Sequence, residues 1–390
     1  MKSERFDNHL RRVTYENLCD SLFDPAKNQY PYLIPKFYAS QLSILEDFVG
    51  ESLENVGTPF TTYLGNNGKI AYAPSSLAQR YFVGVPSFIK IVNMLSPDYD
   101  YSERITIFIA CYQAMGLHGI ELGWGNINFD STKTYPHMGG ISAAEIFNAL
   151  VNNIRREWKL NNIQTKVNSR KIEANRRYID YCRYVDALFG NCARLLVLRI
   201  DLFYKKEHSQ NFSAFDITED LNHLFENKRC NSIFDFMKGY IAKLEYGVDK
   251  GMHWHVLFFF DGSKRNNSSH IHLAEEIGEY WKNTITKGYG DYWNVNKNLR
   301  QYAKLRRQGI GVINWQDIEL RANLKGLVIQ YLCKTDQYIK PKFGTKVRLF
   351  RRGNFPSHAV KKRGRPRHNE ASYAASDQTG KNRTLSNPTP

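Results

Sequence analysis

The chain has 390 residues, of which 42% are hydrophobic, and it carries a formal net charge of +16 at pH 7. This excess of base favours a polyanionic partner such as nucleic acid, and residues 360–390, with seven basic and two acidic side chains (+5), account for only part of it. The absence of an apolar run of about 18 residues excludes a membrane span, and an N-terminus without an apolar core argues against a signal peptide. The six cysteines show no close pairing, which is typical of reduced thiols in a cytoplasm.

Elements of secondary structure can be predicted in chain order. Residues 1–140 form a mainly helical region to which we assign no role, with one helix expected around 101–116. Residues 141–188 predict a helical connector, in which Ser142 and Glu145 have the spacing of a capping box. From residue 189 strands and helices alternate. Strands are expected at 193–204, 239–247, 253–262, 309–315 and 346–353, and helices at 215–228, 272–285 and 320–338.

This order of elements predicts an α+β domain over residues 189–355. A hairpin in its middle indicates a central antiparallel sheet, and we expect the helices on one face of that sheet. Residues 356–390 are poor in hydrophobic side chains and rich in Pro, Gly, Ser, Asn and charge, which predicts a disordered basic tail. Within it the run KKRGRPR (361–367) would add DNA affinity, although such runs are often only solvated.

The stretch MHWHVLFFF (252–260) places two histidines at the start of an apolar strand. Residues two apart in a strand point to the same face, so His253 and His255 would present adjacent imidazoles to a divalent cation. Glu245 on the preceding strand would add a carboxylate and favour Mg²⁺ or Mn²⁺. It joins the histidines only if it pairs with an odd-numbered residue such as His253, which requires an odd-length loop or a bulge. Otherwise the three are solvated or hydrogen-bonded strand residues.

A second His-x-His lies at His270 and His272, where the predicted helix begins. Side chains two apart on a helix project in roughly opposite directions, about 200° apart, so we expect no shared metal there.

The predicted helix over 320–338 contains a candidate nucleophile. Tyr331 and Lys334 are three residues apart and would share a helix face. A tyrosine hydroxyl can attack a phosphodiester and form a covalent phosphotyrosine, and a nearby ammonium can stabilise the charge that develops. Tyr338, two turns further on, is a second candidate. The alternative is a tyrosine at the edge of the core beside a lysine that reaches into solvent.

The strand LLVLRIDLFY, the motif His253-Trp254-His255 and the motif Tyr331-Leu332-Cys333-Lys334 together resemble the three ordered motifs of the HUH endonucleases. These enzymes include rolling-circle replication initiators, relaxases and transposases. Over longer segments the sequence is similar to the inovirus gene-two-type replication proteins of phages and bacterial prophages, which have a YagK/YfjJ-type C-terminal domain. These segments are RLLVLRIDLFY, KLEYGVDKGMHWHVLFFFDGSKR, IGEYW and YLCKTDQY. The resemblance covers about 190–355.

The resemblance implies a ferredoxin-like HUH domain that nicks one DNA strand at an origin and later rejoins it. His253, His255 and Glu245 would hold Mg²⁺ or Mn²⁺, Tyr331 would form a 5′-phosphotyrosine, and Lys334 would assist it. The expected setting is the cytoplasm of a bacterial host cell, with single-stranded and origin DNA and the host replication machinery as partners and no membrane. Asp201 would either pair with Arg199 on its strand or lie near the metal as an accessory residue.

The segment 280–309 interleaves aromatic and basic side chains. Aromatic rings can stack on unpaired bases while cations meet phosphates, although the rings can equally belong to the core. The residues predicted to contact DNA are Trp281, Tyr289, Tyr292, Trp293, Arg300, Lys304, Arg306 and Arg307. Three readings stay open beside replication initiation: a relaxase or transposase of the same class, a phosphoesterase that uses water, and a non-catalytic DNA-binding regulator.

Overall fold

The computed structural model describes residues 34–66, 68–95, 99–117, 131–247, 251–265, 270–334, 339–342 and 347–356. The chain divides into two units, Met1–Phe355 and Pro356–Pro390. Apart from Pro356, the predicted basic tail lies outside the described residues.

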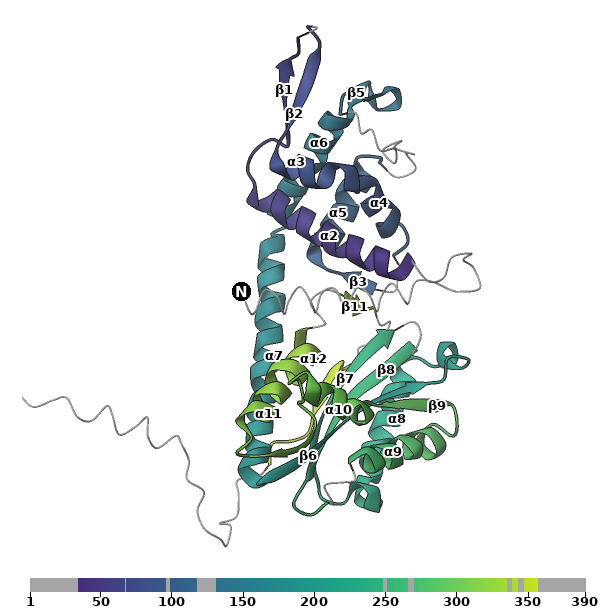
Figure 1. Cartoon of the computed structure of the whole chain (residues 1–390). Helices are drawn as coiled ribbons and strands as arrows, with labels where there is room; N and C mark the ends of the chain where they lie inside the picture. Colours follow the sequence, from purple (N-terminus) through teal and green to yellow (C-terminus); the bar gives the residue numbers. More distant parts are fainter. Residues whose placement is uncertain are drawn as a thin grey trace, which may run out of the picture. The chain divides into compact units, whose positions relative to one another are not determined.

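The first part of the chain folds as helices around an aromatic core (Figure 1). Its elements are α2 (Ile34–Glu54), β1 (Phe60–Leu64), β2 (Ile70–Pro74), α3 (Ser76–Tyr81), α4 (Val85–Val92), β3 (Tyr99–Tyr101), α5 (Glu103–Ala114), β4 (Thr134–Tyr135), β5 (Ile141–Ser142) and α6 (Ala143–Leu160). Phe48 lies at the centre of this core, where its ring packs against those of Phe88, Phe108 and Phe147. The helix expected around 101–116 is confirmed as α5.

Two long helices occupy the predicted connector. In α6 the capping box is confirmed: the Ser142 hydroxyl accepts from the Glu145 N–H, and the Glu145 carboxylate accepts from the Ser142 N–H. The buried face of α6 belongs to the N-terminal core. Helix α7 (Ile163–Asn191) starts in that core at Ile163, and residues 181–189 near its end pack in a different core, against the large sheet.

A six-stranded antiparallel sheet forms the centre of the second part. Its strands are β6 (Arg194–Tyr204), β7 (Met237–Gly247), β8 (Gly251–Asp261), β9 (Gly290–Asn294), β10 (Gly311–Asn314) and β12 (Phe350–Arg352). Their order is β10-β6-β8-β7-β12, and β9 also pairs with β6. Strands β10 and β9 follow one another along β6, the first beside 194–197 and the second beside 200–204. Outside the sheet, β11 (Ile339–Pro341) pairs with β3.

Helices cover both faces of this sheet, so the expectation of helices on one face is wrong (Figure 1). One face packs against α8 (Ala214–Glu226) and α9 (His270–Tyr280). The other face packs against α7 and the helical segment 318–334. The physical reason is that the central strands β6 and β8 carry apolar side chains on both faces, and both faces must be removed from water.

Two helices contain wide π turns where the sequence predicts continuous α-helix. The helix predicted at 272–285 is α9 followed by η7 (Trp281–Ile285). The helix predicted at 320–338 consists of α11 (Ile318–Asn323), the π segment η9 (Leu324–Ile329) and α12 (Gln330–Lys334). Such turns insert an extra residue and are frequent at functional sites. The described residues also form short helical segments: η1 (Phe82–Gly84), η2 (Pro136–Met138), η3 (Ser209–Asn211), η4 (Asn227–Arg229), η5 (Ser232–Phe234), η8 (Val295–Asn298) and α10 (Leu299–Lys304).

Among the described helices, none combines the length and the apolar character needed to cross a bilayer. The cysteines within the described residues, Cys111, Cys182, Cys192, Cys230 and Cys333, are all free thiols.

Candidate metal centre and its neighbouring tyrosine

The β7–β8 hairpin has the odd-length connection that places Glu245 on the same face as His253 and His255. Gly247 pairs with Gly251 across a three-residue connection, residues 248–250, which lie outside the described part. With this odd number of connecting residues, Glu245 pairs directly with His253. Directly paired residues of an antiparallel hairpin share a face, so the carboxylate and both imidazoles lie on one side of the sheet.

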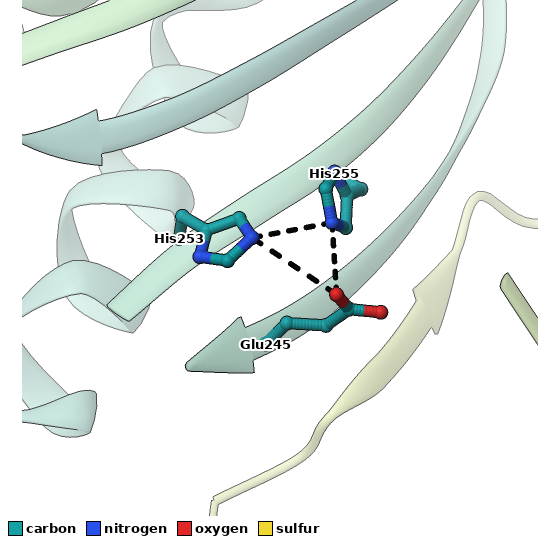
Figure 2. Close-up of side chains that lie close together, drawn as sticks. All are labelled: Glu245, His253 and His255. Carbon is teal, nitrogen blue, oxygen red and sulfur yellow. Dashed lines mark hydrogen bonds and ion pairs between the residues drawn. The ribbon is translucent and has the colours of Figure 1, made fainter. Parts of the chain in front are cut away.

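The three side chains converge on one point (Figure 2). Nε2 of His253 lies 3.2 Å from Nε2 of His255, and Oε2 of Glu245 lies 3.0 Å from the latter and 4.0 Å from the former. Neighbouring ligands of an octahedral ion with bonds of about 2.1 Å are about 3 Å apart. The observed spacing therefore suits a divalent cation, and within the described residues this is the group of His, Cys, Asp and Glu side chains that meets that requirement.

Asp201 supports this group from the neighbouring strand. It pairs with His255 in the β6–β8 register, and its Oδ1 lies 2.6 Å from Nδ1 of His255. A carboxylate at neutral pH can only accept, so Nδ1 carries a proton and Nε2 is the atom that faces the cluster. A carboxylate behind a ligating histidine holds its tautomer and orientation. Oδ1 of Asp201 also lies 3.6 Å from Nε of Arg199. Asp201 therefore pairs with Arg199 and also lies beside a candidate metal ligand.

Charge balance explains how so many ionisable groups stay buried on this face. Burial raises the pKa of Glu245, but Lys243, whose Nζ lies 2.6 Å from Oε1, and His255 outweigh it and hold that pKa well below its ordinary value. Burial lowers the pKa of His255, but Asp201 and Glu245 outweigh it and raise that pKa. Metal ligation requires an Nε2 without a proton, so a metal ion would compete with a proton at this atom of His255.

Tyr331 of α12 packs over the same face of the sheet. The Arg199 guanidinium carbon lies 5.9 Å from the centre of its ring. Burial raises the pKa of the phenol well above its ordinary value, the charge of Glu245 adds to the effect, and Arg199 opposes it. The nucleophile proposed from the sequence therefore lies beside the proposed ligands, in electrostatic contact with them.

Two residues of the predicted catalytic helix cannot be placed. Lys334 closes α12, but its side chain lies outside the described residues, as does the whole of Tyr338. Arg199 provides a cation next to Tyr331, which is the role that the sequence assigns to Lys334.

The second His-x-His lies at the start of a helix, where the sequence predicts one. His270 and His272 open α9, and the side chain of His272 is 74% exposed and lies near Glu275 and Glu276 of its own helix.

One of the predicted DNA contacts is wrong. Trp281 is fully buried under the sheet, and its Nε1 donates to the carbonyl of Phe203, so it cannot stack on a base. Trp281 follows the buried Ile277 of α9 by four residues, so helical spacing already places its ring on the buried face.

The other predicted DNA contacts reach the surface to different degrees. Trp293 is 53% exposed and Tyr289 is 47% exposed, whereas Tyr292 is half-buried and donates to Glu279. Tyr292 and Trp293 belong to β9, a strand that the sequence analysis did not predict. The basic members are all exposed: Arg300, Lys304, Arg306 and Arg307.

Sequence reasoning missed Arg199 and Lys243 as parts of the site. Each stands two residues before an acidic residue of the same face, Asp201 and Glu245, in a strand that is otherwise apolar. Charged residues at i and i+2 in a strand buried on both faces are a usable signal, because such a strand has no solvated face to receive them.

The model of the YagK/YfjJ C-terminal domain family matches residues 157–351, which is half of the chain. The match contains α12 with Tyr331 and the whole sheet apart from Arg352, the last residue of β12. No curated protein and no solved structure matches the sequence.

Proposed function

The chain belongs to the YagK/YfjJ C-terminal domain family, and from this premise we propose that it is a metal-dependent endonuclease that nicks and rejoins single-stranded DNA through a covalent 5′-phosphotyrosine. The observation that carries the proposal is the cluster of Glu245, His253 and His255 on the sheet face over which Tyr331 packs. A metal site alone would fit many hydrolases, and a half-buried tyrosine alone would fit any core. Their shared face favours transfer of a phosphodiester to tyrosine.

The ligand set is suited to Mg²⁺ or Mn²⁺, because two imidazoles and a carboxylate leave coordination positions for water and for a phosphate oxygen. When bound, such an ion polarises the scissile phosphate and offsets its negative charge. His255 is held for this role by Asp201, and Glu245 is held by Lys243.

In the proposed reaction the Tyr331 oxygen attacks phosphorus and loses its proton to solvent. A bond from the tyrosine oxygen to phosphorus forms, and the bond from phosphorus to the 3′-oxygen breaks. The products are a phosphotyrosine on the 5′ end and a free 3′-hydroxyl. Arg199 stabilises the negative charge that the phenol oxygen gains, which is needed because burial raises the pKa of Tyr331. Reversal of the same step rejoins the strand.

A free 3′-hydroxyl is a primer for a polymerase, so we propose rolling-circle replication of a phage, prophage or plasmid as the setting. The partners would be origin DNA and the host replication machinery in the bacterial cytoplasm. A relaxase or transposase would use the same residues for the same chemistry, and the DNA context decides among these settings.

A covalent adduct tests the proposal. The full chain is incubated with Mn²⁺ and a pool of random-sequence single-stranded oligonucleotides labelled at the 3′ end, and labelled protein is resolved on a denaturing gel. We expect an adduct with the wild type and none with Tyr331→Phe. Tyr302→Phe, at another tyrosine packed against the same core, is the matched control and should keep the adduct. Tyr338→Phe shows whether the second tyrosine takes part. Strand cleavage that persists in Tyr331→Phe would instead indicate water as the nucleophile.

A further inference from the structure

A cleft of about 790 Å³ lies at the edge of the large sheet, between α7 and β12. Four arginines and two carboxylates are among its lining residues, so the lining has a net charge of +2. The arginines are Arg177, Arg348, Arg351 and Arg352. The cleft is thus polar, open to solvent and positively charged.

The four cations differ in how far they are neutralised. Arg352 is bound by Asp180 through two contacts of 2.7 and 3.2 Å. Arg177 lies 3.3 Å from Glu173 and stacks on the ring of Phe350.

The remaining two, Arg348 and Arg351, have no carboxylate partner within the described residues. Arg351 donates to Asn222 with one terminal nitrogen, and its other terminal nitrogen is buried without a described partner. Arg351 pairs with Ala242 and lies over the ring of Trp254, so its side chain is on the α8 face, opposite the metal centre. The charge that remains available to an anion on the metal-centre side is that of Arg348.

Strand register connects the cleft to the metal centre. Phe350 pairs with Lys243, and Lys243 pairs with His255, so the three lie in one row across β12, β7 and β8. Strands in a sheet are about 4.8 Å apart, which places Phe350 about 10 Å from His255. On the other side of the metal centre the same row continues through Asp201 to Trp293 of β9.

We propose that the cleft binds backbone phosphates of the DNA strand on one side of the scissile phosphate. The strand would run across this row, with a base stacked on the exposed face of Trp293 on one side of the metal centre and a phosphate held by Arg348 on the other. The inference rests on the proposed nickase function, because it places the strand at that centre. Nucleic acid is favoured over a free anion because the cleft is open and larger than one phosphate and because the net charge of the chain is +16.

The salt dependence of DNA binding tests this site without any chemistry. Binding of a labelled mixed-sequence single strand to the full chain is measured by fluorescence anisotropy in EDTA over a series of chloride concentrations. Each lost contact to a single-strand phosphate lowers the slope of log K against log salt by about 0.7. We expect a slope lower by about 0.7 in Arg348→Ala. Arg348→Ala/Arg351→Ala should show no further decrease, because Arg351 lies on the other face of the sheet.

The matched control is Arg229→Ala, an exposed arginine of η4, which follows the α8 helix of the other face. It should keep the wild-type slope. Because Arg348 is exposed, its substitution tests the site even if the double variant fails to fold. An unchanged slope in Arg348→Ala, or the same decrease in Arg229→Ala, would overturn the proposal.

A second arm adds inorganic phosphate at constant ionic strength. The affinity for the strand should stay unchanged, since one mobile anion competes poorly with a polyanion held at many points. If phosphate displaced the strand from the wild type and not from Arg348→Ala, the cleft would be a site for a small anion and the proposal would be wrong. The adduct assay separates the two claims. A lower slope in Arg348→Ala without any Tyr331 adduct in the wild type would support DNA binding in the cleft and reject the nickase. An adduct together with an unchanged slope would support the nickase and reject DNA binding in the cleft.

Discussion

Replacing Asp201 by asparagine isolates the contribution of the carboxylate behind His255. The 2.6 Å contact from Oδ1 to Nδ1 is buried, and both partners lie in paired strands. Asparagine keeps the shape but removes the charge, and its amide can donate to Nδ1, which leaves the proton on the Nε2 atom that must bind metal. Loss of such a supporting partner typically costs about 10- to 100-fold in metal affinity. That range corresponds to about 1.4–2.7 kcal/mol.

The assay is Mn²⁺ binding by isothermal titration calorimetry. Asp201→Asn should raise the dissociation constant about 10- to 100-fold while the far-ultraviolet circular dichroism stays unchanged. Asp220→Asn is the control, because Asp220 accepts from Tyr204, whose side chain belongs to the core on the other face, and it should bind Mn²⁺ like the wild type. Wild-type affinity in Asp201→Asn, combined with a loss of affinity in Glu245→Gln, would show that the histidine does not depend on Asp201.

Four further predictions concern the scaffold and are measured by chemical denaturation. Trp254→Ala should lower the free energy of unfolding by about 3–5 kcal/mol, because the ring is fully buried; a loss below about 1 kcal/mol would contradict the packing. Gly278→Ala should cost about 1–3 kcal/mol, since its Cβ would meet the Tyr292 ring at 2.2 Å, and a neutral effect would mean that the ring moves away freely. Ser142→Ala should cost about 1 kcal/mol at pH 7 through loss of the cap. Hydrogen bonds from Ser142 lower the pKa of Glu145 below 4.5, so the carboxylate stabilises the fold fully above pH 4.5 and less as the pH falls through the lowered pKa. The difference in the free energy of unfolding between the wild type and Glu145→Gln should therefore shrink in acid. A difference that stays constant with pH would refute this.

The local part of the metal centre could be predicted from the sequence. His253 and His255 share a face because strand periodicity is local, and Glu245 joins them through a short hairpin whose register depends on a few residues. Asp201 differs, since its place beside His255 depends on pairing between strands more than fifty residues apart. A single sequence gives the face of Asp201 but not its partner.

Two of the errors were avoidable, because the local sequence pattern already indicated the burial that the structure shows. The alternation of aromatic and basic residues around Trp281 and Trp293 resembles a DNA-binding surface, yet Trp281 lies on the buried face of its helix, four residues after Ile277, and Trp293 is exposed on a strand. Placement of helices on one face was avoidable, because the unbroken apolar run 256–260 already indicates a strand buried on both faces.

The most direct test of the central claim is to map the covalent link by tandem mass spectrometry. Wild-type protein incubated with Mn²⁺ and single-stranded oligonucleotides is digested with protease and nuclease, and the peptide that contains residue 331 is sequenced. We predict a nucleotide phosphate on Tyr331 that is lost in EDTA and in His255→Ala. A phosphate carried by a different tyrosine, or an adduct on Tyr331 that forms equally well without metal, would contradict it.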